Sequence, residues 1–234
     1  MALKEFTSIV PLRQADRRVL FWAYVAIPLQ YLWIYLGWFW MFTIFIPVAI
    51  FLFLPIRMVI GGETKGFIRS CGIIHWAVML TVFSLSHISI LYSLPINEQA
   101  GSVGVLLYLL LLTQFNDISQ YLWGKSCGKR KILPKISPNK TWEGFLGGIL
   151  NVCVVSLIVG PLITPLGSLE SLGSGLIIGI GGFFGDVVLS AIKRDLEIKD
   201  CGKLLPGHGG LLDRLDSLTF TAPLFFHYLY YLHF

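Results

Sequence analysis

Long runs of apolar residues, separated by short polar segments, dominate the chain. Seven runs are long enough to predict membrane-spanning helices, because a helix needs about 20 mainly apolar residues to cross the hydrocarbon core. The runs cover residues 19–36, 38–56, 70–94, 102–123, 142–160, 172–189 and 218–234. The pattern predicts an all-α, polytopic membrane bundle of about seven helices. We expect one membrane domain over 1–234, with an N-terminal hairpin and link (1–69) and a helical core (70–234).

The basic residues predict how these spans are oriented. All 18 Lys and Arg residues lie before the first span or in the loops 57–69, 124–140 and 190–216. The loops on the other side contain Glu98 and Glu170 and no basic residue. Because Lys and Arg accumulate in cytoplasmic loops, we expect the N-terminus and the three basic loops to be cytoplasmic.

One polar stretch, Gly185–Asp216, concentrates charge in a chain that is 55% hydrophobic and only 13% charged. Charge beside hydrocarbon is costly unless it has a partner. Anchoring to anionic lipid would explain the basic residues of this stretch but not its acidic ones, which such lipid repels. The stretch therefore indicates a site that holds a cation and phosphate groups.

Carboxylates at the membrane edge suit Mg²⁺, which proteins usually bind through one or two carboxylates together with substrate phosphates. Asp213 and Asp216 are three residues apart, so on a helix they would share a face. The run Pro206–Gly210 lets backbone approach a ligand closely. Two other segments are predicted on the same side of the membrane, Asn116–Asp117 and 137–143. A cation site, basic side chains and a glycine-rich loop in one place together favour phosphoryl or nucleotidyl transfer.

The spacing of these residues is specific. The fixed positions are Ser190-x-x-Lys193-Arg194, Lys199-Asp200-x-Gly202, Pro206-Gly-His208-Gly-Gly210 and Asp213-Arg214-x-Asp216. This pattern resembles the signature of the phosphatidate cytidylyltransferases, also called CDP-diacylglycerol synthases. The segment Ile136–Gly144 and the pair Gly185–Asp186 are similar to further segments of that family.

The resemblance implies a membrane enzyme that joins CTP to phosphatidic acid, forming CDP-diacylglycerol and pyrophosphate in phospholipid biosynthesis. It implies a bacterial inner-membrane location with the site facing the cytoplasm, Mg²⁺ with room for a second, monovalent cation, and no nucleic-acid partner. The implied metal ligands are Asp186 and Asp213, and Asp216 is a further candidate. The candidate catalytic residues are Asp186, Asp213, Asp200 and Lys193. The implied substrate-binding residues are Lys140, Ser137, Asn139, Arg194, Lys199, His208, Arg214 and Asp117.

The sequence departs from the family pattern at two positions and in length. Leu189 stands where the family often has Glu, Gln120 stands where it has Ala, and we expect about two spans fewer than the usual nine. These departures leave open a different acceptor, such as a polyprenol or a related phospholipid, and a non-catalytic relative or transporter. A transporter would favour charges in the middle of spans, whereas Asp117 and Asp186 lie at predicted span ends. The glycine-rich run 172–189 favours a close helix contact, such as a homodimer.

Overall fold

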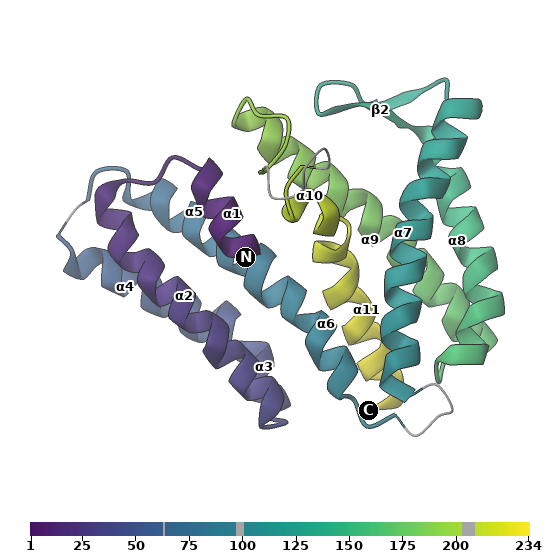
Figure 1. Ribbon diagram of the computed structural model, residues 1–234, viewed down its shortest axis with the longest axis horizontal. Helices are drawn as coiled ribbons and strands as arrows, with labels where there is room; N and C mark the ends of the chain where they lie inside the picture. The colour runs from purple at the N-terminus through teal and green to yellow at the C-terminus, as the bar shows by residue number, and fades with distance from the viewer. Residues whose placement is uncertain (63, 97–100, 203–208) are drawn as a thin grey trace. The chain divides into compact units, whose positions relative to one another are not determined.

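The computed structural model describes residues 1–62, 64–96, 101–202 and 209–234 (Figure 1). The chain divides into two compact units, one of residues 1–89 with 200–212 and the other of residues 90–199 with 213–234. Nearly all regular structure in the described residues is helical, which confirms the predicted all-α class. The predicted single membrane domain, with an N-terminal part (1–69) and a helical core (70–234), stays a prediction.

The first unit is built mainly of α-helices, and two π-helical segments each join two of them end to end. Its α-helices are α1 (Ala2–Ile9), α2 (Gln14–Tyr35), α3 (Phe39–Ile44), α4 (Phe51–Ile60), α5 (Phe67–Val78) and the beginning of α6 (Ser84–Ser93). The π-helical segments η1 (Phe45–Ile50) and η2 (Met79–Phe83) connect α3 to α4 and α5 to α6. Pro47 lies within η1, where its missing N–H interrupts the α-helical hydrogen-bond pattern. The buried Gln30 amide donates to the Phe42 carbonyl at 3.1 Å and so ties α2 to α3.

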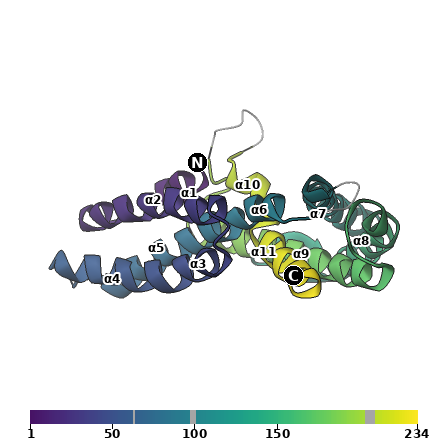
Figure 2. The same cartoon turned by 90° about the horizontal axis from the view of Figure 1, so that it is seen from below.

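The second unit is a bundle of long helices with a small hairpin. Its elements are α7 (Gly101–Ser126), β1 (Lys131–Leu133), β2 (Ser137–Thr141), α8 (Trp142–Ile163), α9 (Ser168–Asp195), α11 (Leu218–His233) and most of the short α10 (Leu212–Leu215). Helix α8 packs against α7 on one side and α9 on another, and α11 packs against α9 (Figures 1 and 2). The buried Tyr108 hydroxyl lies 2.9 Å from the Ser156 hydroxyl and 2.5 Å from that of Ser174, which links α7, α8 and α9.

Five helical stretches among the described residues are long and apolar enough to cross a membrane. They are Phe39–Ile60, Phe67–Ser93, Gly101–Ser126, Trp142–Ile163 and Ser168–Asp195, which correspond to the second to sixth predicted spans. The first predicted span is helical within α2, but its Trp, Tyr and Gln residues lower its hydropathy. The last, α11, has only 16 residues, about 24 Å of helix. The membrane class is confirmed, while the count of seven and the cytoplasmic orientation stay predictions.

Candidate functional site

The basic connector 124–140 forms a β-hairpin that is held between two helices. Strands β1 and β2 pair antiparallel, with Lys131 opposite Thr141 and Leu133 opposite Ser137. Thr141 then caps α8, because its hydroxyl accepts the Gly144 N–H at 3.1 Å. The sequence predicted the start of a helix near Trp142, which the structure confirms, but it treated 124–140 only as a basic connector and did not predict the hairpin.

A pocket of about 600 Å³ opens where the hairpin, α7 and α9 meet. Its size is within the range of small-molecule sites. Five predicted site residues line it, from three separate elements: Asp117 on α7, Ser137, Asn139 and Lys140 on β2, and Asp186 on α9. The structure therefore brings together residues that are up to 69 positions apart in the sequence.

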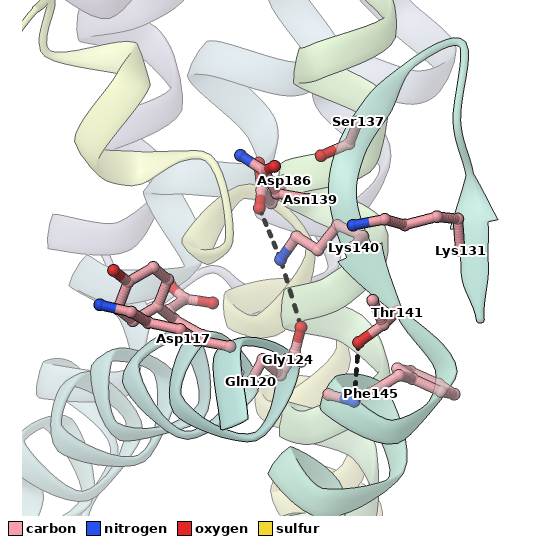
Figure 3. Close-up of a pocket in the computed structure, with 13 residues that line it drawn as sticks. Asp117, Gln120, Gly124, Lys131, Ser137, Asn139, Lys140, Thr141, Phe145 and Asp186 are labelled. Carbon is pink, nitrogen blue, oxygen red and sulfur yellow. Dashed lines mark hydrogen bonds and ion pairs between the residues drawn. The ribbon is translucent and has the colours of Figure 1, made fainter. Parts of the chain in front are cut away.

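Lys140 is the central charged group of this pocket. Its ammonium lies 2.7 Å from a carboxylate oxygen of Asp186 and donates to the Gln120 side-chain oxygen at 3.2 Å, as Figure 3 shows. The two charged side chains are 18% and 26% exposed, so water screens their attraction only in part. Gln120 in turn donates to Asn116 at 3.1 Å, and Asn116 donates to the Gly179 carbonyl of α9 at 3.3 Å. Lys140 is thus fixed by a hydrogen-bonded chain that reaches the buried interior.

Glycines let the backbones around the pocket approach one another. A Cβ on Gly144 would lie 2.7 Å from the Gln120 carbonyl of α7, and a Cβ on Gly148 would overlap the Gln120 side chain. A Cβ on Gly185 would lie 2.5 Å from the Asp216 carbonyl. Only glycine permits contacts this close. The glycine at 185 therefore lets the Asp216–Ser217 segment lie directly against α9, beside Asp186.

A second group of predicted residues lies in the same unit, around the end of α9. The Lys193 ammonium pairs with Asp213 at 2.8 Å, and both side chains are largely buried, at 15% and 10% exposure. The Ser217 hydroxyl lies 3.0 Å from both carboxylate oxygens of Asp117. The Ser217 N–H donates to Asp216 at 2.8 Å. Through Ser217, the signature segment and α7 share one hydrogen-bonded network.

Asp216 lies close enough to Asp186 and Asp117 for the three carboxylates to interact electrostatically. Burial, together with the nearby carboxylates of Asp186 and Asp117, raises the pKa of Asp216 to about 7. Hard carboxylate oxygens in an electronegative site fit the donor set of Mg²⁺. In the described part of the chain, no three His, Cys, Asp or Glu side chains converge closely enough to hold a metal by themselves. Mg²⁺ usually takes only one or two carboxylates and keeps water and substrate phosphates as its other ligands. The predicted metal ligands stay predictions.

The remaining predicted residues lie outside the pocket lining that the structure describes. The Arg194 guanidinium donates to the Ile136 carbonyl of the hairpin at 3.3 Å and is exposed. Lys199 and Arg214 are exposed, and Asp200 is an exposed residue of the first unit. His208 lies outside the described residues. Leu189, the departure within the signature, is buried at 1% exposure, as suits an apolar side chain.

The structure adds functional candidates that sequence reasoning missed. Gln120 and Ser217 contact predicted site residues directly, and Lys125, Lys131 and Phe145 line the pocket. The position of Gln120 had a usable signal, because residues three and four apart share a helix face and Gln120 follows Asp117 and Asn116 by these spacings. Ser217 had no such signal, since its partner is 100 positions away.

Comparison with known proteins places the chain among related sequences. The model of the cytidylyltransferase family matches residues 1–232. The chain is 52% identical over 231 residues to the uncharacterized protein YnbB of Escherichia coli (strain K12), covering 99% of this chain and 76% of that protein.

Two named enzymes match a shorter part. The phosphatidate cytidylyltransferase of Staphylococcus aureus (strain COL) is 38% identical over 144 residues, which are 61% of this chain and 55% of that enzyme. The phosphatidate cytidylyltransferase of Bacillus subtilis (strain 168) is 44% identical over 128 residues, which are 53% of this chain and 45% of that enzyme. The match thus spans about half the length of these enzymes. Since the family model covers nearly the whole chain, the protein belongs to the cytidylyltransferase family of nucleotidyltransferase enzymes.

Proposed function

We propose that the protein transfers the cytidylyl group of CTP to phosphatidic acid, forming CDP-diacylglycerol and pyrophosphate at the cytoplasmic face of the membrane. The observation that carries this proposal is the pocket around Lys140 and Asp186, which joins cationic and anionic groups where the hairpin meets the C-terminal parts of two apolar helices, α7 and α9. The family match and the two similar phosphatidate cytidylyltransferases support the same reaction.

The two ion pairs are suited to exchange partners when substrate binds. In the free protein Lys140 pairs with Asp186, and Lys193 pairs with Asp213. An arriving triphosphate competes for the lysines, because phosphate oxygens bind ammonium groups strongly. The released Asp186 and Asp213 then become available to a cation. Each of these four groups then keeps an opposite partner in both states, so the exchange avoids the cost of leaving one of them buried and unpaired.

In the reaction, an oxygen of the lipid phosphate attacks the α-phosphorus of CTP and forms a new P–O bond. The bond between the α-phosphorus and the bridging oxygen breaks, and pyrophosphate leaves with that oxygen. Lys140 and Lys193 would hold phosphate oxygens and offset the charge that develops on them. Mg²⁺, when bound by Asp186 and Asp213 with Asp216 nearby, would supply further neutralisation of the triphosphate.

A panel of acceptors tests the proposal. The purified protein in phospholipid nanodiscs is incubated with CTP, Mg²⁺ and one acceptor at a time: phosphatidic acid, diacylglycerol or a polyprenol. Of the three acceptors, we expect only phosphatidic acid to give release of pyrophosphate. Release of CDP with a hydroxyl-bearing acceptor would instead indicate a CTP-dependent lipid kinase. Absence of turnover with every acceptor would contradict an enzymatic role.

A further inference from the structure

Glu5 on the N-terminal helix α1 contacts residues of the polar stretch that was singled out in the sequence, Gly185–Asp216. Oε2 of Glu5 accepts the backbone N–H of Leu211 at 2.9 Å and that of Leu212 at 3.2 Å. Leu212 is the first residue of α10, and the first amides of a helix have no partner inside the helix. Glu5 therefore satisfies two backbone donors immediately before Asp213, the next residue of the chain.

The other carboxylate oxygen of Glu5 explains two glycines of the signature. Oε1 is buried, has no hydrogen-bond partner among the described residues and lies against Gly202 and Gly210. A Cβ on either glycine would overlap this oxygen, and the three atoms nearest to a Cβ on Gly202 all belong to Glu5. Neither glycine has a positive φ, in contrast to Gly209 at +78°. Room for the Glu5 carboxylate is thus the steric reason for glycine at position 202.

An ordinary surface glutamate would not have this environment. Burying a carboxylate oxygen costs free energy unless other interactions offset the cost. Here the two backbone N–H donors supply charge-assisted hydrogen bonds, which are stronger than neutral ones. Leu3 and Phe6, on either side of Glu5 in the sequence, are buried at 2% and 3% exposure, so α1 itself is anchored. The contacts therefore hold Gly202 and the segment 210–212 against α1.

We propose that Glu5 is a positioning residue that fixes the segment leading into Asp213. It touches neither substrate nor cation in this role; it sets the backbone conformation at Leu211 and Leu212. Its importance for turnover rests on the proposed function, in which Asp213 binds the cation. Its structural effect does not rest on that function.

Hydrogen exchange tests the structural part without any substrate. The variants are Glu5→Ala and the milder Glu5→Gln, both in the full chain and checked for folding by size-exclusion chromatography. We expect Glu5→Ala to speed exchange of the amides in peptide 209–216 by tenfold or more. Glu5→Gln keeps an acceptor oxygen and should change the rate less. Unchanged exchange in Glu5→Ala would overturn the proposal.

A double-mutant cycle tests the glycine argument. Gly202→Ala should lower the melting temperature in wild type by several degrees and change it little in the Glu5→Ala background, where the obstructing carboxylate is absent. Gly209→Ala is the matched control, because its cost comes from a positive φ and should be equal in both backgrounds. Equal effects of Gly202→Ala in both backgrounds would contradict the role of Glu5.

Turnover then separates this inference from the proposed function. We expect Glu5→Ala to lower kcat for CDP-lipid formation about tenfold or more with less than a threefold change in KM for CTP, and Glu5→Gln to restore most of it. An unchanged kcat despite faster exchange would overturn the link to Asp213. If wild type itself forms no CDP-lipid, the proposed function fails, while the exchange experiment and the cycle still decide the role of Glu5.

Discussion

Replacing Lys140 by Met should separate the chemical role of this residue from its structural one. Met keeps much of the length of the side chain and removes its charge. In the free protein the variant loses the 2.7 Å ion pair with Asp186 and the 3.2 Å hydrogen bond to Gln120. Asp186 then keeps one described contact, the Ser190 hydroxyl at 3.2 Å.

The two effects should differ in size. Hydrogen bonds to charged groups contribute about 1.5–3 kcal/mol to stability, and partial exposure of this pair places it toward the lower end of that range. Losing one preorganised partner for transition-state charge costs about 10²–10³-fold in kcat, or about 3–4 kcal/mol. We therefore expect Lys140→Met to reduce kcat by at least 100-fold while its melting temperature falls by only a few degrees.

The assay combines CDP-lipid formation with thermal unfolding in detergent. Lys135→Met is the matched control, since this lysine lies in the turn of the same hairpin, is exposed and does not line the described pocket. The double variant Lys140→Met/Asp186→Asn should recover part of the lost stability, because neither charge is left unpaired, without recovering activity. Retention of more than a third of wild-type kcat in Lys140→Met would refute the reasoning.

Three further predictions follow from the same region. Asp213→Asn should lower kcat at least 100-fold, whereas the control Asp195→Asn, at an exposed residue of α9, should stay within twofold; equal effects would refute the cation assignment. Removing divalent cations with EDTA should abolish turnover, and adding Mg²⁺ back should restore it; EDTA-resistant turnover would contradict the need for a divalent cation. Because the raised pKa of Asp216, about 7, means that the folded protein binds an extra proton between about pH 4 and 7, stability without added cation should fall as pH rises through this range. Thermal melts at several pH values measure this dependence. Asp216→Asn should make stability fall less steeply with rising pH, and an unchanged pH dependence would contradict the role of Asp216.

The helices could be predicted from the sequence because hydrophobic run length decides them locally. Five runs became candidate spans as expected. The two outer ones are less clear: α2 is diluted by Trp, Tyr and Gln, and α11 is short. The π-helical segments and the hairpin were not predictable. The segment 137–141 contains Pro138 and Asn139, which are poor strand formers, and its pairing depends on how its ends are held by Arg130 and Thr141.

Five residues that the sequence singled out line the pocket, but their contacts could not be predicted. The charged residues could be recognised because charges beside apolar membrane segments are costly and therefore rare. Their partners could not be read from periodicity, because the pairs Lys140–Asp186 and Lys193–Asp213 join different elements. The contact between Glu5 and Leu211, 206 positions apart, depends wholly on the folded chain. Gln120 can be recognised as a partner of Lys140 only from the folded structure, in which Lys140 donates to it.

Transfer of the α-phosphate of CTP to lipid is the most direct test of the proposed function. The purified protein is supplied with phosphatidic acid, Mg²⁺ and CTP labelled at either the α- or the γ-phosphate, and the lipid fraction is separated by thin-layer chromatography. The account predicts that α-label enters a lipid that migrates as CDP-diacylglycerol, that γ-label is recovered in pyrophosphate, and that Lys140→Met abolishes both signals. Entry of γ-label into the lipid, or the absence of labelled lipid with the wild-type protein, would contradict the proposed function.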